Sequence, residues 1–292
     1  MEAVLAQLTC LNESIIIIAF FYYLVAKMNP KLDRKLSLLH ATAINMIDMV
    51  GIGPFVVLSV VAQIMGGPYF LYAWVAGAIL SYLDAMVWSQ LGAALPRAGG
   101  SFHFLKEGYG KKLGPLMSFL FVWQTMIQAP LVIASAAIGF SQYANYFFHL
   151  SFLQEKAVSG LVVILVILLL YRKIESIGKI SVFLWVGVMG TMAWIIFGGV
   201  MHGQFLEPIK HINDGFSMQH GFVAALGFAS VKTIYSYLGY YNVCHLGGEI
   251  KNPSKNIPRS MFISITGIAI LYLSMNISVA SVLPLETIMS SK

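Results

Sequence analysis

Three ionisable residues lie inside long apolar segments of this 292-residue chain. These are Asp48, Asp84 and Lys232. A charge at the centre of a membrane helix costs at least about 2.5–3.5 kcal/mol on insertion scales. Asp48 stands three residues before Gly51, and Lys232 stands three residues before Tyr235. We therefore expect Asp48 either to form a static ion pair with Lys232 between two helices or to exchange a proton.

The same two apolar segments carry residues that interrupt a helix. The run Val50-Gly-Ile-Gly-Pro-Phe55 places two glycines and a proline side by side. Pro54 removes a backbone donor and clashes with the carbonyl of Val50, and each glycine weakens a helix by about 1 kcal/mol. The run Tyr235-Ser-Tyr-Leu-Gly-Tyr-Tyr-Asn242 places a lone glycine among polar groups. A kinked helix with small residues at a packing face is the alternative for the first run.

Paired interruptions in two halves of a membrane protein indicate a binding site for a small polar molecule. Where a helix breaks, the freed N–H groups and the positive end of the helix dipole can hold a carboxylate. The carbonyl groups that end the other half can accept hydrogen bonds from an ammonium group. A zwitterionic amino acid needs both kinds of group at short separation, so two breaks that face each other fit such a ligand.

The composition requires a membrane to position these segments. Hydrophobic residues make up 58% of the chain, charged residues only 10%, and the mean hydropathy is +0.78. Soluble domains carry about 25% charged residues. Because a bilayer offers no partners for unpaired backbone groups, every span should be a helix. We predict seven spans, of which the third is longer than a bilayer needs: Leu39–Ile64, Tyr69–Leu95, Leu113–Phe147, Ala157–Tyr171, Ile180–Met201, Phe222–Leu246 and Met261–Leu285.

The distribution of Lys and Arg predicts the orientation of these spans. Fourteen of the 18 Lys and Arg residues fall in the loops on one side, and three fall on the other. The richer side is cytoplasmic by the positive-inside rule, which places the start of the first span inside. The formal charge of +6 thus serves orientation, and we expect no nucleic acid partner. The predicted location is the plasma (inner) membrane.

The first 27 residues fit this scheme poorly. Ser14–Ala26 is apolar but short for a span, and it lacks the flanking features of a signal peptide. Met28 opens a charged stretch that could begin the protein. We interpret residues 1–27 as an N-terminal extension, with an extra anchoring helix as the alternative, and residues 28–292 as one transmembrane domain.

Three motifs, in order, resemble those of the amino acid–polyamine–organocation permeases. Val50–Phe55 resembles the glycine-rich break of their first helix. Leu95-Pro-Arg-Ala-Gly-Gly-Ser-Phe-His-Phe-Leu-Lys-Glu-Gly-Tyr-Gly110 is similar to the stretch before their third helix. Gly248-Glu-Ile-Lys-Asn-Pro-Ser-Lys-Asn-Ile-Pro-Arg259 is similar to the segment after their sixth. The resemblance extends from about residue 36 to the C-terminus. It implies an all-α membrane protein with a leucine-transporter-like inverted-repeat fold, truncated after about seven transmembrane helices.

The resemblance also implies roles for particular residues. The substrate carboxylate would meet the backbone of Gly51, Ile52 and Gly53. The α-amino group would meet carbonyls at the end of one half-helix and around Gly239 on the other; these carbonyls belong to Met49, Val50, Tyr235, Ser236 and Leu238. Two departures from the family pattern are Ile52 and Pro54 in the first break, and Leu238 would narrow the side-chain pocket. A small or medium neutral amino acid is therefore the expected substrate.

The resemblance further implies a gate at each end of the path. Tyr235 stands where the family often has an aromatic gate. Glu249 is the expected inner-gate carboxylate, paired with a loop cation such as Arg97 or Lys106. Possible proton coupling would involve Asp48.

Other chemistry finds little support in the sequence. The two cysteines, Cys10 and Cys244, lie in unrelated segments, and the histidines lack partners at metal-ligand spacing, so we expect no metal site and no cofactor. We find no nucleophile–base arrangement and no phosphate-binding loop, which argues against an enzyme. Alternatives to amino acid transport are a polyamine or organic cation transporter, a truncated remnant that does not transport, and an amino-acid sensor. The family usually has ten core helices, so the chain would be a fragment, a truncated product or half of a split protein.

Overall fold

The computed structural model describes residues 34–51, 53–171, 174–213 and 220–290. The chain divides into two compact units, Met1–Arg34 and Lys35–Lys292, and the fold described below is that of the second. The predicted N-terminal extension, residues 1–27, lies outside the described residues, as does Ile52.

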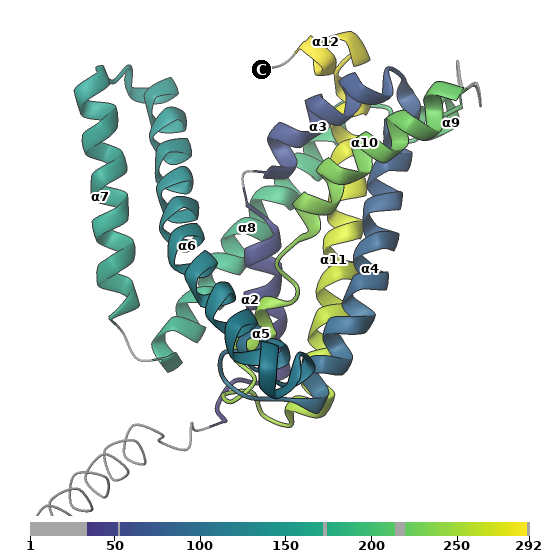
Figure 1. The fold of residues 1–292 in the computed structure, drawn as a ribbon. Helices are drawn as coiled ribbons and strands as arrows, with labels where there is room; N and C mark the ends of the chain where they lie inside the picture. Colours follow the sequence, from purple (N-terminus) through teal and green to yellow (C-terminus); the bar gives the residue numbers. More distant parts are fainter. Residues whose placement is uncertain (1–33, 52, 172–173, 214–219, 291–292) are drawn as a thin grey trace, which may run out of the picture. The chain divides into compact units, whose positions relative to one another are not determined.

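The second unit is built of helices (Figure 1). They are, in chain order, α2 (Leu38–Met49), α3 (Gly53–Met65), η1 (Pro68–Phe70), α4 (Leu71–Ala94), α5 (Ser101–Gly108), α6 (Gly110–Phe148), α7 (Phe152–Leu170), α8 (Ile174–His202), α9 (Glu207–Lys210), α10 (His220–Tyr237), η2 (Asn242–His245), α11 (Pro253–Val282) and α12 (Leu285–Ser290). Within the described ranges there is no β-strand, and β-type pairing is limited to two isolated bridges, Leu36 with Ile250 and Ala98 with Leu246.

Six helical segments of the described chain are long and apolar enough to cross a membrane. A seventh span is formed if α2 and α3, which meet at an angle of 44°, are taken as one broken helix. All seven predicted spans are thereby confirmed, although α11 begins at Pro253, well before Met261, where the seventh span was predicted to start. The third span, α6, has 39 residues, as its long apolar pattern predicted. The protein is an all-α, multi-pass integral membrane protein.

Local sequence signals explain where several helices begin. The hydroxyl of Ser37 caps α2 by accepting a hydrogen bond from the backbone N–H of His40. Ser151 and Gln154 form a reciprocal capping box at the start of α7. Asn252, at φ 46°, is followed by Pro253 at the first position of α11, where the missing N–H of proline does no harm. The Asn-Pro pair of the third motif is thus a helix start.

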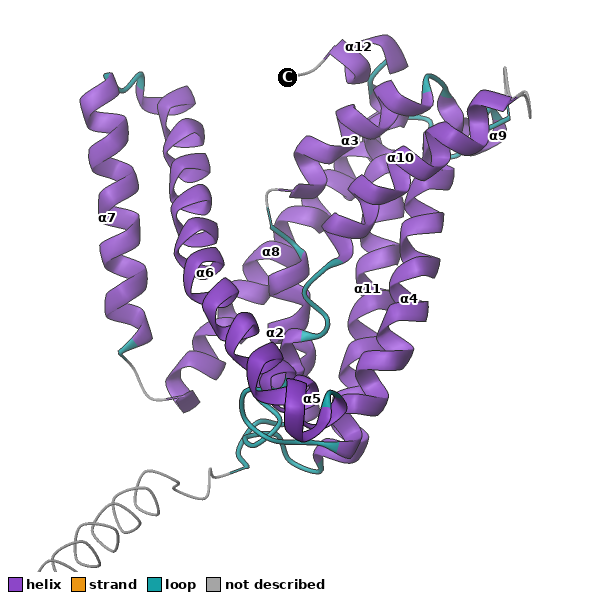
Figure 2. Ribbon diagram, in the orientation of Figure 1, coloured by secondary structure: helices purple, strands orange, loops and turns teal. Residues whose placement is uncertain are grey.

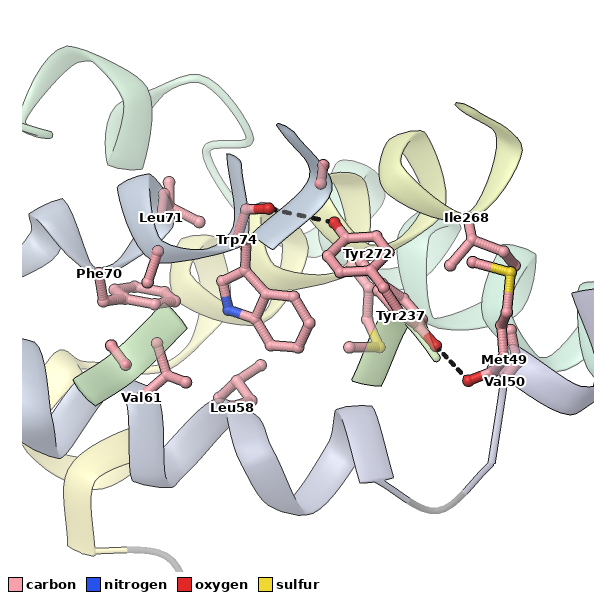
Figure 3. Packing of buried hydrophobic residues seen from close by; sticks show 14 of the residues in the cluster. Met49, Val50, Leu58, Val61, Phe70, Leu71, Trp74, Tyr237, Ile268 and Tyr272 are labelled. Atoms are coloured by element: carbon pink, nitrogen blue, oxygen red, sulfur yellow. Dashed lines mark hydrogen bonds between the residues drawn. The ribbon is translucent and has the colours of Figure 1, made fainter. Parts of the chain in front are cut away.

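The packed core lies where α11 contacts α2, α4 and α8, and where α10 contacts α3 and α4. Helices α4 and α10 approach closely because Gly77 has no side chain; a Cβ there would stand 2.4 Å from Oγ1 of Thr233. That Thr233 hydroxyl donates to the carbonyl of Ala73 at 2.8 Å. Trp74 and Tyr272 fill the space between the helices and are fully buried (Figure 3). This core fixes both interrupted spans against the straight helices α4 and α11.

Three short helices were not expected from the sequence: α5, α9 and α12. The last of them, α12, follows directly after Pro284. The amide of Gln63 on α3 donates to the carbonyl of Met289 on α12. Such short helices depend on tertiary contacts, because an isolated helix of this length is unstable in water.

Candidate functional site

The first span breaks after Met49. The N–H of Val50 still donates to the carbonyl of Met46 at 3.0 Å, but its ψ of 79° turns the chain out of the helix. The N–H of Gly51 then donates back to the carbonyl of Met49 at 3.2 Å. A new helix, α3, begins at Gly53 in a different direction, and the interruption is visible midway along the span (Figure 2).

The second interrupted span breaks after Tyr237, the last residue of α10. The N–H of Leu238 still donates to the carbonyl of Ile234 at 3.1 Å, as in a helix, and is shared with the carbonyl of Tyr235 at 3.3 Å. Gly239 has φ +129°, a conformation that residues with a side chain rarely adopt. The chain then runs as a loop until η2 begins at Asn242, and this loop crosses the middle of the unit (Figure 2).

The two breaks are in direct contact. A Cβ built on Gly239 would stand 3.0 Å from both the carbonyl carbon of Asp48 and the backbone nitrogen of Met49. Any side chain at position 239 would therefore collide with the end of α2. The glycine and proline pattern located both breaks, and the structure shows that the second glycine allows them to touch.

A tyrosine that the sequence did not single out joins the two breaks. The hydroxyl of Tyr272 on α11 lies 2.7 Å from the carbonyl oxygen of Met49 (Figure 3). The same hydroxyl lies 3.1 Å from the carbonyl oxygen of Ser236. Its ring packs against Trp74 and Tyr237, with centroids 5.4 and 5.2 Å away. Nothing in the local sequence separates Tyr272 from the other tyrosines of the chain, so only the fold identifies it.

Asp48 lines an open cavity of about 530 Å³ beside the breaks. The amide of Asn242 donates a hydrogen bond to its carboxylate. The other residues that line the cavity are Ile44, Ile47, Gly51, His245 and Leu246. The second intramembrane carboxylate, Asp84 on α4, accepts a hydrogen bond of 2.6 Å from the hydroxyl of Tyr240. Each carboxylate thus accepts a hydrogen bond from a neutral side chain, Asn242 or Tyr240, in the segment that follows the break in the second span.

Lys232 does not lie at this cavity. Among the described residues, the structure records no ion pair between Asp48 and Lys232. Lys232 and Tyr235 lie three residues apart on the outward face of α10, where both are exposed, Tyr235 by 68%. Thr233 and Ser236 occupy the buried face. The expected ion pair between Asp48 and Lys232 is therefore not formed, because the helical spacing places Lys232 on the exposed face of α10, with Tyr235.

The remaining residues expected at the site divide between the two breaks. Met49 and Val50 are buried at the end of α2, and Gly51 is exposed to the cavity. Ser236 is buried at the end of α10, while Leu238 is half-buried. The structure thus brings the backbone of both expected segments together.

The second and third sequence motifs meet at a loop junction, formed by residues 35–37, 95–100 and 242–252. The N–H of Gly99 donates to the carbonyl of His245 at 2.9 Å. Gly100 has φ +26°, and a Cβ there would stand 2.7 Å from the carbonyl carbon and oxygen of Cys244. The Gly-Gly pair is therefore needed for the close approach of two backbones.

The segment before α2 joins the same loop junction. The N–H of Leu36 donates to the carbonyl of Glu249, and the N–H of Lys251 donates to the carbonyl of Leu36, both at 2.9 Å. The Oε2 atom of Glu249 is buried without a hydrogen-bond partner among the described residues. Burial raises the pKa of this carboxyl group.

The ion pair expected between Glu249 and a loop cation is not recorded in the described part of the chain. Arg97 instead lies 3.6 Å from the carboxylate of Glu107, and both side chains are more than half exposed. Short-range geometry explains this outcome, because Glu107 on α5 follows the Gly-Gly turn and faces back toward Arg97. A pair so exposed contributes at most about 1 kcal/mol.

Comparison with known proteins agrees with this architecture. The family model described as "Amino acid permease" matches residues 36–292. Solute carrier family 7 member 13 of Mus musculus is 27% identical over 281 residues, covering 91% of this chain and 56% of the relative. A serine/threonine exchanger of Bacillus subtilis is 28% identical over 265 residues, covering 89% and 57%. An aspartate–proton symporter of the same organism is 26% identical over 275 residues, covering 88% and 49%.

The fold and the facing breaks define a polytopic membrane protein of the permease class. The chain belongs to the amino acid permease family, since the family model covers most of its length. This confirms the resemblance seen in the three motifs. The chain spans about half the length of the curated relatives it matches.

Proposed function

We propose that the protein transports amino acids across the membrane by alternating access, with the substrate held between the two breaks. The observation that carries this proposal is the contact between the end of α2 and the end of α10. Two half-helices end there with carbonyl groups that point beyond the helix ends, and a third half-helix, α3, begins there at Gly53. Negative and positive dipole ends therefore lie together, as a zwitterion requires.

The proposed contacts follow from these polarities. The carboxylate would meet N–H groups of Gly51, Ile52 and Gly53 before α3. The ammonium group would meet carbonyls at the C-terminal ends of α2 and α10, which belong to Met49, Val50, Tyr235, Ser236 and Leu238. The half-buried side chain of Leu238 stands next to Gly239 and would limit the pocket, so we propose a small or medium neutral substrate.

Proton coupling through Asp48 is part of the proposal. Asp48 faces a cavity, its hydrogen-bond partner is the neutral Asn242, and no recorded cation neutralises it among the described residues. A carboxylate so placed within a span gains most from binding a proton. One relative, from Bacillus subtilis, is named an aspartate–proton symporter, and proton coupling here would be in keeping with that name.

Gating and location complete the proposal. Tyr235 would gate the substrate path, and the loop junction, which holds Arg97 and Glu249, would form the inner gate. The domain of residues 28–292 would lie in the plasma (inner) membrane with the start of α2 in the cytoplasm.

The test is uptake by the protein, expressed in full and reconstituted in proteoliposomes, with labelled neutral, acidic and basic amino acids and putrescine. Gly239→Ala should reduce uptake at least about tenfold, because the new Cβ would press on Asp48 and Met49 in a strained conformation. Gly227→Ala, on the preceding helix α10, is the matched control, since a Cβ there meets nothing within 4 Å.

Each outcome of that test is informative. Uptake of putrescine but of no amino acid would support the organic cation alternative. Saturable binding without accumulation would indicate a sensor or a remnant. Equal uptake by both glycine variants would refute the site between the breaks.

Asp48→Asn tests the coupling separately. If Asp48 carries the proton, this variant should lose the stimulation of uptake by an inward proton gradient, while substrate exchange without a gradient persists. A pH dependence identical to that of the wild type would exclude the proton role.

A further inference from the structure

The contacts of Tyr272 carry an inference that rests on the proposed function and deepens it. The hydroxyl of Tyr272 reaches two carbonyl oxygens that belong to different broken helices, at 2.7 Å for Met49 and 3.1 Å for Ser236. Met49 is the last residue of α2, and Ser236 is the last but one of α10. Carbonyls at these positions lack the helical partner that a continuous helix would supply.

The chemistry of a phenol leaves acceptor capacity unused at these two carbonyls. A tyrosine hydroxyl carries one hydrogen and can donate it to one acceptor at a time. The carbonyl of Met49 also accepts from the N–H of Gly51 at 3.2 Å, but each carbonyl oxygen has two lone pairs, so lone pairs remain without a recorded donor among the described residues. An ammonium group, which has three donors and a positive charge, fits between two such carbonyls and can also donate to the phenol oxygen.

The surroundings hold the hydroxyl in place. Tyr272 and Tyr237 are both fully buried, and the two rings and that of Trp74 pack on one another at centroid distances of 5.2 to 6.3 Å (Figure 3). Because the ring cannot turn away, rotation about the C–O bond is the remaining freedom of the hydroxyl. The position of α11 thereby sets the spacing of the two half-helix ends.

We propose that Tyr272 is a positioning residue of the amine site. In the empty protein its hydroxyl holds the carbonyls of Met49 and Ser236 at one spacing. When a primary amine binds, the hydroxyl stays on one carbonyl and the ammonium group of the substrate takes the other. The ligand class that fits the site is a primary ammonium, of which an α-amino acid is one case.

The matched pair of variants is Tyr272→Phe and Tyr237→Phe. Each change removes one hydroxyl from the same aromatic cluster and keeps the ring. The hydroxyl of Tyr237 donates at 3.2 Å to the carbonyl of Trp74, within the continuous helix α4 and away from both breaks. A loss that is merely structural should therefore affect both variants alike, and the melting temperature of each variant in detergent records that loss.

Two measurements test the proposal on the protein expressed in full. The first is hydrogen–deuterium exchange of peptides that cover residues 45–55 and 234–242. Tyr272→Phe should speed exchange in both segments, and Tyr237→Phe in neither. Unchanged exchange in both segments of Tyr272→Phe overturns the positioning role, whether or not the protein transports amino acids.

The second measurement is the KM for uptake. Tyr272→Phe should raise the KM for the best amino acid about tenfold, with a smaller change in maximal rate, whereas Tyr237→Phe should change it less than about twofold. Equal KM values in the two variants overturn the role of Tyr272 in holding the amine. If the wild type takes up no amino acid at all, the proposed function fails, and so does the proposal that the substrate's ammonium group replaces Tyr272 as the donor to one carbonyl. The exchange experiment still decides whether Tyr272 positions the two half-helix ends.

Discussion

Gly100→Ala is the sharpest test of the loop junction. The new Cβ would stand 2.7 Å from the carbonyl carbon and oxygen of Cys244, closer than real Cβ atoms come to such groups. These are backbone atoms and cannot rotate away. The φ of +26° adds strain of about 1–2 kcal/mol for a residue with a side chain. Separating the two backbones would also lose the hydrogen bond from Gly99 to His245, worth about 1 kcal/mol. We therefore expect the closed junction to lose about 2–3 kcal/mol.

Cys244 itself reports on this junction. It is 1% exposed, and Cys10 is the other cysteine of the chain. In a Cys10→Ser background, labelling of Cys244 by N-ethylmaleimide should require the junction to open. A loss of 2–3 kcal/mol predicts labelling about 30- to 150-fold faster in Gly100→Ala. Gly108→Ala in the neighbouring helix α5 is the control, because a Cβ there meets nothing within 4 Å. If the two variants are labelled at the same rate, the glycine pair does not hold the junction together.

Three further variants test other parts of the structure. Gly77→Ala should lower stability by about 2 kcal/mol, because its Cβ would overlap the side chain of Thr233. Gly190→Ala should not, because a Cβ there meets nothing within 4 Å. Equal melting temperatures of the two variants would contradict the packing of α4 on α10. Arg97→Ala should change stability by less than about 1 kcal/mol, as measured by thermal unfolding, since its ion pair is exposed. Glu249→Gln should raise the melting temperature at neutral pH and have little effect at acid pH. Burial raises the pKa of Glu249, so the folded state binds the proton more tightly than the unfolded state does. The wild type therefore loses stability as the pH rises, and the variant does not. A lower melting temperature at neutral pH in this last variant would show that the carboxylate has a favourable partner.

The sequence predicted the spans and the positions of both breaks well. Long apolar runs can satisfy their backbone in a membrane only as helices, so their number and type follow from composition alone. Glycine and proline act on the local backbone, and the breaks therefore fall between Met49 and Gly53 and at Gly239, within the two runs that the sequence singled out. The capping residue Ser37 and the pair Asn252–Pro253 are local signals of the same kind.

The pairing of side chains across helices was predicted less well. Lys232 and Asp48 stand at equal offsets from the breaks, yet Lys232 lies on the outward face of α10 and Asn242 contacts Asp48 instead. Offsets along a chain do not fix the rotation of one helix against another, which depends on how all the buried side chains pack. Arg97 likewise pairs with Glu107 on the neighbouring helix α5, and not with Glu249, the partner expected from the sequence.

Two broken helices in a membrane chain are therefore properties that the sequence determined by itself. The contact between the breaks was decided by the tertiary structure, because it depends on α11 bringing the hydroxyl of Tyr272 to carbonyls 223 and 36 residues away in the chain. Backbone interruptions arise from local sterics, which a short run of residues encodes. A hydrogen bond between distant segments exists only after the helices have packed, and the residue that makes it becomes recognisable at that stage.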